Sequence, residues 1–254
     1  SCDAVVIAAG AREARTLAAP GIDAEGVVMA LDYLTASTRS VLDGSDPAIS
    51  ARGLDVVVIG GGDTGNDCVG TAVRQGARSV RQLEVMPEPP VSRTPDNPWP
   101  QWPHIKKTDY GQEEAIALMD GEMRNWSIDT REVLTDDAGH VRALKIVDLD
   151  WSDGAPTPVA GSERELPAQL VLIACGFVGP QHAIMDTFGA TLPAPGHGRP
   201  LPVMATPNSH RCACAEGATE PTGGIWACGD ARGGASLVVN AIADGMACAQ
   251  EILA

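Results

Sequence analysis

The chain has 254 residues, of which 44% are apolar, enough for one large or two ordinary domains with a sizeable core. Aromatic residues make up only 4%, so this core is expected to consist of Val, Leu, Ile and Ala. The formal net charge is -15, which leaves no basic patch to neutralise phosphates. The composition therefore argues against nucleic acid or an anionic membrane as a partner.

Cysteine usage favours a reducing, cytoplasmic compartment. The chain has seven cysteines, an odd number, most of them lie in apolar runs, and no CxxC pair occurs. Cys212 and Cys214 have only His210 nearby, whereas a metal site needs more ligands at recognisable spacing, so no metal site is predicted. No run of about 18 apolar residues predicts a membrane-spanning helix.

The first residues predict a buried strand. Residues 4–10 form an apolar run that ends in Gly10, with neither the basic start nor the cleavage site of a signal peptide. A chain that begins directly on such a strand is expected to be a fragment. A turn at Pro20-Gly21, a short helix over 30–42 and a polar loop over 44–53 follow.

A strand, a glycine-rich turn, a helix and a second strand come next. Residues 54–59 are rich in β-branched side chains, and the helix runs to about residue 75, where Gly76 fits its C-terminal end. The second strand covers residues 79–85. This order predicts one βαβ unit.

The remaining segments alternate between irregular and regular structure. Residues 87–103 are rich in Pro, which removes hydrogen-bond donors, so they predict an irregular loop that Trp99 and Trp102 anchor by packing. The regular elements are predicted to be a helix at 111–119, a hairpin of strands at 126–134 and 140–151 with its turn at 136–139, strands at 170–174 and 225–228, and a last helix at 236–253.

The glycines of the βαβ unit carry the strongest functional signal. A GxGxxG motif between a strand and a helix is the fingerprint of dinucleotide binding. Gly60 permits the tight turn, Gly62 lets the backbone approach a pyrophosphate, and Gly65 lets helix and strand pack closely. The N–H groups that open the helix would bind the phosphate charge; the alternative is a glycine turn without a ligand. The predicted cofactor-binding residues here are Gly60, Gly61, Gly62, Asp63, Thr64 and Gly65.

An acidic residue ends the second strand of this unit. Glu84 is placed to accept both ribose hydroxyls of NADH and to repel the 2′-phosphate of NADPH. This favours NADH, unless Glu84 is only a solvated surface acid. The alternative is that Arg78, Arg81 or Arg93 binds a 2′-phosphate, and Arg93 is kept as a candidate cofactor-binding residue.

A second constellation lies near the C-terminus, where a strand ends in Gly229-Asp230 and a helix opens at Ser236-Leu237-Val238. An Asp at this place can bind a ribityl hydroxyl, and a helix N-terminus can stabilise negative charge on a reduced flavin. The alternative role for Asp230 is to cap a helix. The candidate flavin-binding residues are Gly229, Asp230, Ser236, Leu237 and Val238.

Several of these motifs occur together in one known family. They are Gly60 to Cys68, Gln82 to Pro87, the loop from Pro95 to Pro103, Asp109-Tyr110-Gly111, Cys175 to Pro180, Gly229-Asp230 and Ser236 to Val239. The set resembles the glutamate synthase small (beta) subunit, in its C-terminal portion, and the matching region of the single-chain NADH glutamate synthase. The tryptophan loop makes the resemblance specific, and the likeness weakens over about 190–224.

The resemblance implies an α/β fold in which a Rossmann-like NAD(P)-binding domain is inserted into a partial FAD-binding Rossmann-like domain. The expected limits are 1–30 for the remainder of the first half of the FAD domain, 31–180 for the NAD(P)H domain and 181–254 for the second half. Gly10 and Gly176 join the candidate cofactor-binding residues, Gly176 because it leaves room for the nicotinamide at the end of a strand.

The family implies an activity and partners as well. Its members pass hydride from NADH or NADPH to FAD, and electrons continue through iron–sulfur clusters to a large subunit or domain that forms glutamate from glutamine and 2-oxoglutarate. The clusters are expected outside this chain. The FAD site is expected to be incomplete, because the family's first FAD glycine motif is not found before Asp3. The chain alone is therefore expected to bind FAD poorly and to be inactive as a flavoenzyme.

No catalytic side chain is expected, because hydride passes directly between the cofactor rings. Two alternatives stay open at this point. One is another pyridine-nucleotide flavin reductase of the same superfamily, and the other is a nucleotide-binding module that catalyses nothing.

Overall fold

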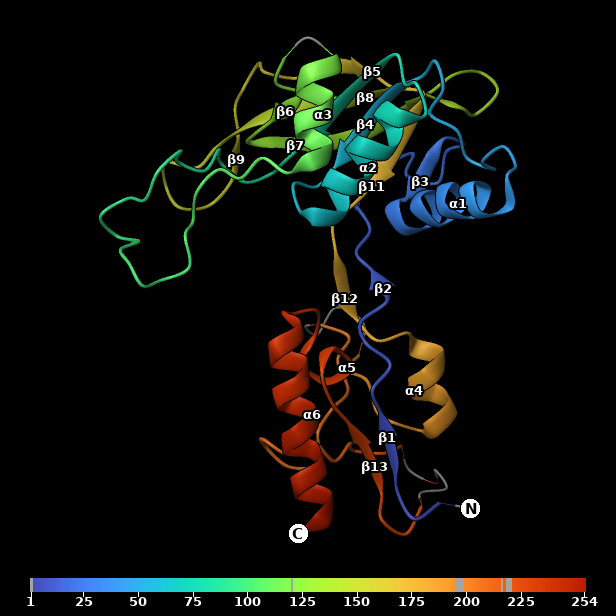
Figure 1. Cartoon of the computed structure of the whole chain (residues 1–254), viewed down its shortest axis with the longest axis vertical. Helices are drawn as coiled ribbons and strands as arrows, with labels where there is room; N and C mark the ends of the chain where they lie inside the picture. The colour runs from blue at the N-terminus through green and yellow to red at the C-terminus, as the bar shows by residue number, and fades with distance from the viewer. Residues whose placement is uncertain (1, 120, 195–198, 216, 218–220) are drawn as a thin grey trace. The chain divides into compact units, whose positions relative to one another are not determined.

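A computed structural model describes residues 2–119, 121–194, 199–215, 217 and 221–254, which form two compact units (Figure 1). The inserted unit is Thr16–Cys175, and the split unit combines the residues up to Arg15 with Gly176–Ala254. The predicted α/β fold with one domain inserted into another is therefore confirmed. The divisions fall after Arg15 and after Cys175, whereas the expected limits are 30 and 180. The first one differs because residues 27–29 pair with the sheet of the inserted unit.

The inserted unit is built on a five-stranded sheet in the order β3-β11-β4-β5-β6. All of its pairings are parallel, so the carboxyl ends of its strands share one edge. Its strands are β3 (Val27–Met29), β4 (Asp55–Ile59), β5 (Ser79–Leu83), β6 (Arg124–Asn125) and β11 (Leu170–Ile173).

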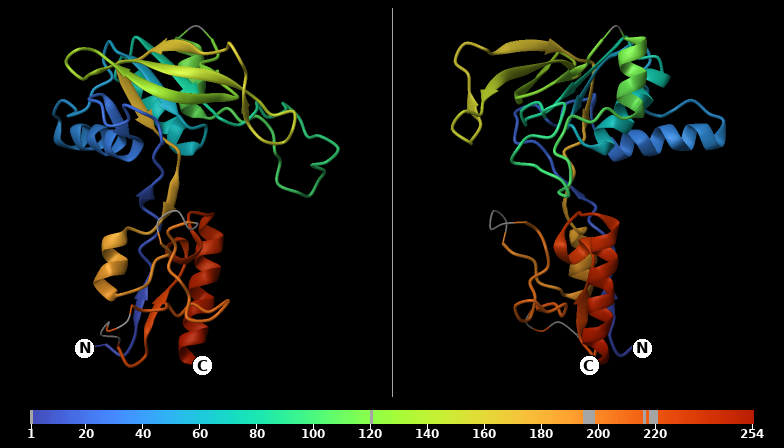
Figure 2. Two further views of the ribbon diagram at one scale, coloured as in Figure 1. Left: turned by 180° about the vertical axis from the view of Figure 1, so that it is seen from behind. Right: turned by 60° about the vertical axis from the view of Figure 1, so that its left-hand side comes forward.

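The two faces of this sheet are covered differently, as Figure 2 shows. Val56 and Val58 pack with helical residues such as Val69, whereas Val57 and Ile59 pack with a β-hairpin. Both faces of a parallel sheet are normally buried in this way. The helices are α1 (Ala30–Asp43), α2 (Asp63–Arg74) and α3 (Tyr110–Leu118); the antiparallel strands on the other face are β7 (Ile128–Thr135), β8 (Val141–Asp150), β9 (Thr157–Pro158) and β10 (Arg164–Pro167).

The predicted βαβ unit and hairpin are confirmed. Strands β4 and β5 are parallel neighbours with α2 between them in sequence, and Gly76 has the left-handed φ of +83° that ends such a helix. Strands β3, β6 and β10 were not predicted. They are only two to four residues long, and the partners of β3 and β6 lie far away in the sequence, so no local pattern reveals them.

The tryptophan loop, residues 87–103, is ordered by a buried asparagine. Trp99 and Trp102 are 82% and 68% exposed, so the prediction that they anchor the loop by packing is wrong. Asn97 is buried instead: its Oδ1 accepts from the N–H of His104 at 2.8 Å, and its Nδ2 donates to the carbonyl of Trp102 at 3.0 Å. A side-chain amide can join donors and acceptors of several residues, which an indole ring cannot.

The split unit contains a parallel strand pair, β1 (Val5–Ile7) with β13 (Ile225–Ala227), at two places where the sequence predicts strands. An antiparallel pair, β2 (Glu13–Ala14) with β12 (Phe177–Gly179), joins the two sequence segments of this unit. Its helices are α4 (His182–Phe188), α5 (Asp230–Gly233) and α6 (Val238–Leu253). None of the helices described is long and apolar enough to span a membrane.

Candidate nucleotide-binding site

The glycine turn joins β4 to α2 at the carboxyl edge of the parallel sheet. Gly60 has a φ of +122°, and a Cβ atom there would collide with the carbonyl oxygen of Ala174. A Cβ atom on Gly65 would collide with the carbonyl oxygen of Gly60. These two glycines are therefore required by close backbone packing, which is the role that the fingerprint gives them.

Gly62 differs from both, because no atom lies within 4 Å of the place a Cβ would occupy. It is the N-cap of α2 and makes no side-chain capping bond. The first N–H groups of a helix have no acceptor within the helix, and the helix dipole is positive at this end. Gly62, Asp63 and Thr64 thus open α2 toward free space, a geometry suited to a phosphate group.

Glu84 follows β5 and is bonded to the glycine turn. Its Oε2 accepts from the N–H of Gly61 at 2.7 Å, and its Oε1 accepts from the N–H of Met86 at 3.0 Å. The carboxylate is thus part of the turn and not simply a solvated surface acid. Its role toward a ribose stays a prediction.

The three arginines considered for a 2′-phosphate do not gather at this turn. Arg78 donates to Asp55 at 2.9 Å, where β4 and β5 begin, and the turn lies about 15 Å away at the other ends of these strands. Arg93 donates to the carbonyls of Asn97 at 3.1 Å and Gln101 at 2.8 Å, so its guanidinium supports the tryptophan loop. Arg81 lies exposed on β5.

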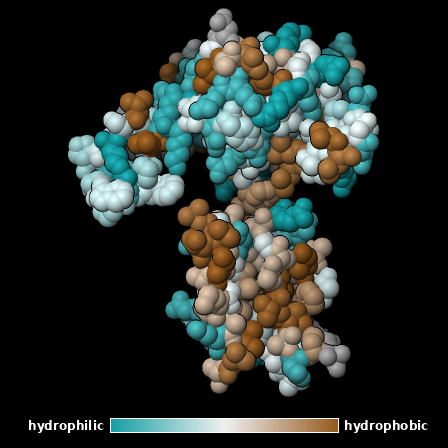
Figure 3. Space-filling view, in the orientation of Figure 1, coloured by the Kyte–Doolittle hydropathy of each residue, from teal (hydrophilic) through white to brown (hydrophobic). Residues whose placement is uncertain are grey.

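In the split unit, the structure brings several predicted flavin-binding residues together. The hydroxyl of Ser236 donates to Asp230 Oδ1 at 3.1 Å. Gly229, and not Asp230, is the N-cap of the short α5. Leu237 and Val238 are exposed at the start of α6, within an apolar surface over that helix (Figure 3). An acidic group beside an uncapped helix start and an apolar surface is suited to a flavin.

Asp244 of α6 holds the segment that contains Gly229 and Asp230 in place by hydrogen bonds, a role that the sequence did not predict. Its Oδ2 accepts from the N–H of Gly229 at 2.7 Å, and Nε of Arg232 donates to both of its oxygens at 3.1 Å. The buried ring of His210 lies between Asp244 at 3.3 Å and Glu251 at 2.7 Å. The Arg232 hydrogen bonds lower the pKa of Asp244 to about 2.

This pKa predicts an acid-sensitive split unit. A carboxylate with a lowered folded-state pKa contributes stability above its unfolded value near 4, and that stability is lost as the pH falls toward about 2. We expect hydrogen-exchange protection of α6, corrected for intrinsic exchange, to fall between pH 5 and about pH 2. Asp244→Asn should lower protection at pH 7 and weaken this dependence, whereas Asp153→Asn in an exposed turn should not. Part of the dependence should remain, because hydrogen bonds from Ser209 and His210 also lower the pKa of Glu251 on the same helix to about 2. Equal pH profiles for the parent and Asp244→Asn would contradict the role.

Gly10 and Gly176 are both open positions of the split unit. They have left-handed φ values of +72° and +80°, and nothing lies within 4 Å of a Cβ built on either. Close packing therefore does not explain these glycines. Their contact with a cofactor stays a prediction.

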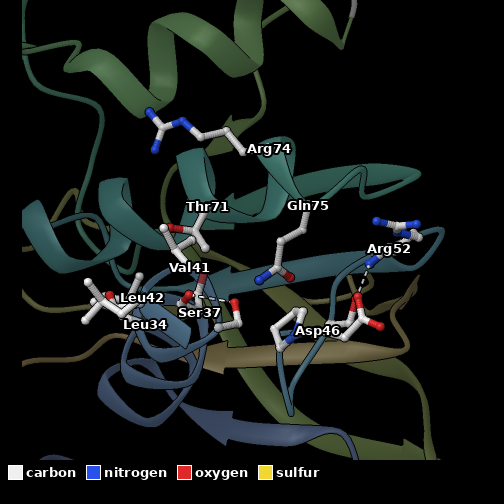
Figure 4. A pocket seen from close by; sticks show the side chains of 13 residues that line it. Leu34, Ser37, Val41, Leu42, Asp46, Arg52, Thr71, Arg74 and Gln75 are labelled. Carbon is white, nitrogen blue, oxygen red and sulfur yellow. Dashed lines mark hydrogen bonds between the residues drawn. The ribbon is translucent and has the colours of Figure 1, made fainter. Parts of the chain in front are cut away.

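A cavity of about 710 Å³ lies elsewhere in the inserted unit (Figure 4). It is bounded by α1 and by the last turn of α2, with Leu34, Val41, Thr71 and Gln75 among its lining residues. The first and last residues of α2, Asp63 and Arg74, are about 16 Å apart along the helix axis, given 1.5 Å per residue. The cavity is thus separate from the glycine turn and contains none of the predicted cofactor-binding residues.

Comparisons with known proteins agree with this geometry. Residues 1–100 match the family model described as pyridine nucleotide-disulphide oxidoreductase. The structure of Mycobacterium tuberculosis FprA in complex with NADPH matches with a TM-score of 0.60 at 17% identity, covering 99% of this chain and 63% of that chain. The fold is therefore that of the pyridine nucleotide-disulphide oxidoreductases.

Relatives at higher identity include several glutamate synthases. The chain is 40% identical to the NADH glutamate synthase of Schizosaccharomyces pombe, over 98% of this chain and 12% of that protein. It is 38% identical to the NADPH glutamate synthase small chain of Bacillus subtilis, over 98% of this chain and 50% of that protein. The chain is thus a homologue of the glutamate synthase small chain, which confirms the predicted resemblance. It spans about half the length of that small chain.

Proposed function

We propose that this chain is the electron-input part of a glutamate synthase, in which the inserted unit binds NADH or NADPH and the split unit contributes to FAD binding. The observation that carries the proposal is the open glycine turn at the start of α2, in a chain that is 38–40% identical to two glutamate synthases. When both cofactors are bound, hydride passes from the nicotinamide to the flavin.

The residues of the inserted unit fit a dinucleotide. A side chain on Gly62 would fill the space that faces the N-terminus of α2, so the position acts as a cradle for a diphosphate. Glu84 borders the same turn and supplies acceptor oxygens for ribose hydroxyls. These residues bind and orient the cofactor, and none has to transfer a proton.

The residues of the split unit fit the ribityl and ring portions of a flavin. Asp230 offers a carboxylate beside Ser236, and Asp244 holds the turn that carries it. The start of α6 would stabilise negative charge on the flavin ring. This unit positions a flavin and requires no acid or base of its own.

The homologues support one class of partner. The electrons would pass through iron–sulfur clusters outside this chain to a large subunit or domain that forms glutamate from glutamine and 2-oxoglutarate. In the single-chain relative of S. pombe, the matching region is a small part of a much longer protein, so the partner there is a domain of the same chain. A cytoplasmic location fits this metabolic role.

The proposal is tested by nucleotide binding, because the FAD site of this chain is expected to be incomplete. NADH should bind the chain with a saturable change in nicotinamide fluorescence. An unchanged nicotinamide signal would contradict the proposed function.

Glu84 is expected to favour NADH over NADPH. A carboxylate near a 2′-phosphate repels it, and NADPH also lacks the 2′-hydroxyl that the carboxylate can accept from. Glu84→Gln keeps an acceptor for the N–H of Gly61 and removes the charge, so the preference should narrow by about tenfold, or roughly 1.4 kcal/mol.

The affinities of both coenzymes are measured by fluorescence titration at fixed moderate salt. Glu163→Gln, an exposed acid on the hairpin side, is the matched control and should leave the ratio unchanged. A parent chain that already binds NADPH more tightly than NADH would refute the role of Glu84.

A further inference from the structure

A chain of buried amides lies beneath the glycine turn. Gln82, Gln112 and Asn66 are all buried, and Gln82 is only 1% exposed. Buried amides are costly unless their hydrogen bonds are made, so each of these side chains needs partners. They come from three elements, β5, α3 and α2, that surround the turn.

Gln82 donates directly to the turn. Its Nε2 lies 2.8 Å from the carbonyl oxygen of Gly60, and its Oε1 accepts from Nε2 of Gln112 at 3.0 Å. Oε1 of Gln112 accepts in turn from the backbone N–H of Asp109 at 3.1 Å. The hydrogen bonds thus form a series that begins at the backbone N–H of Asp109, which can only donate, and ends at the carbonyl of Gly60, which can only accept. These two ends define the orientation of both amides.

Asn66, a residue of α2, links the buried amides to this helix. Its Oδ1 accepts from the N–H of Gln112 at 3.0 Å, and its own N–H donates to the carbonyl of Gly62 at 3.0 Å. The starts of α2 and α3 are therefore held together next to the turn. A Cβ on Gly111 would collide with the carbonyl oxygen of Asn66, so this approach is close.

The consequence concerns one peptide group, the one that links Gly60 to Gly61. Gln82 binds its carbonyl oxygen at 2.8 Å, and Glu84 binds its N–H at 2.7 Å. The two side chains are two positions apart along the chain, a spacing that places them on one side of an extended backbone. Both polar atoms of this peptide are thus clamped, which defines the direction in which the following residues present their N–H groups.

We propose that Gln82 is a positioning residue for dinucleotide binding, because its amide orients the Gly60–Gly61 peptide of the glycine turn. The inference rests on the proposed nucleotide-binding role of that turn. Gln82 does not touch the cofactor; it acts through the turn, and Gln112 keeps its amide oriented. Loss of the Gln82 donor leaves the Gly60 carbonyl without this partner, so that only the bond from the Gly61 N–H to Glu84 still orients the peptide.

The first test is Gln82→Met, which is similar in shape and cannot donate. We expect the chain with this substitution to bind NADH at least about tenfold more weakly, the size expected for loss of a buried hydrogen bond. Gln169→Met is the matched control. Gln169 accepts from the N–H of Asp55 at 3.0 Å, where β4 begins, so its loss should lower stability without changing NADH affinity.

The second test restores the bonds by protonation. In Gln82→Glu, a carboxylate would face the Gly60 carbonyl at pH 8, whereas a protonated carboxyl can donate to that carbonyl and accept from Gln112. The affinity for NAD+, measured by calorimetry relative to the parent chain, should therefore recover as the pH is lowered from 8 to 5.5. Gln82→Met should show no such recovery, because it has no proton to gain.

The outcomes are distinguishable. If the parent chain binds neither NADH nor NAD+, the proposed function fails and this inference fails with it. If the parent binds but Gln82→Met, while folded, binds equally well, the positioning role alone is overturned. If Gln82→Met does not fold, the pH series of Gln82→Glu decides, and an affinity ratio that stays constant from pH 8 to 5.5 overturns the role.

Discussion

Gly62→Val is expected to abolish NADH binding and to leave the fold intact. The backbone of Gly62 has a φ of -81°, which any residue adopts, and nothing lies within 4 Å of its Cβ position. A valine would instead occupy the space in front of α2 that a diphosphate needs. Several charge-assisted hydrogen bonds of about 1.5–3 kcal/mol each would be lost, so the affinity should fall by about 100-fold or more.

The free energy of unfolding should change by no more than about 1 kcal/mol, the cost of a poorer helix N-cap. Gly233→Val is the control, since Gly233 also has free space at its Cβ and lies in the other unit. Both variants are compared with the parent by fluorescence titration with NADH and by urea denaturation. Equal titration curves for Gly62→Val and the parent would show that the diphosphate binds elsewhere.

Gly60→Ala should differ from Gly62→Val, because its main effect should be a large loss of stability of the inserted unit. At a φ of +122° a side chain is strained, and its Cβ would overlap the backbone of Ala174 at the end of β11. Backbone atoms of a central strand cannot move aside cheaply, so the inserted unit should lose about 3 kcal/mol or more.

Urea denaturation followed by tryptophan fluorescence measures this loss, because four of the five tryptophans lie in the inserted unit. The loss has two causes, the positive φ and the overlap with Ala174. Gly44→Ala tests the first cause alone, because Gly44 has a left-handed φ of +64° but free space around its Cβ position. That variant should lose only about 1 kcal/mol. A loss for Gly60→Ala no larger than for Gly44→Ala would mean that the approach to β11 is not tight.

The nucleotide-binding core could be predicted from sequence because its signals are local. The β-branched run before Gly60, the spacing of the glycines and the stop at Gly76 all lie within one short stretch, and each has a physical meaning there. The short strand β3 could not be found in this way, since its three residues acquire their role only by pairing with β11. Its pairing also explains why the inserted unit begins earlier in the chain than expected.

The supporting polar residues escaped prediction for a related reason. Asp244 and Gly229 are joined only by the fold, and no sequence spacing predicts their 2.7 Å hydrogen bond. Gln82 did carry a signal, because a glutamine between the apolar Val80 and Leu83 in a predicted buried strand must find a partner. The tryptophan loop shows the opposite error, because its large apolar side chains suggested an anchor, whereas the amide of Asn97 and the guanidinium of Arg93 hold the loop.

Folding of the split unit brings together two segments that are far apart in the sequence, which costs conformational entropy of the residues between them. A folded inserted unit lowers this cost. Its two segments are joined through about 160 residues, and closing a flexible loop of that length costs on the order of 4 kcal/mol. Yet Arg15 and Gly176, which flank the insertion, are linked by a backbone hydrogen bond of 2.9 Å next to the β2–β12 pair. A folded insertion replaces the flexible loop with a short closure, so the order of folding favours the inserted unit first and the split unit after it.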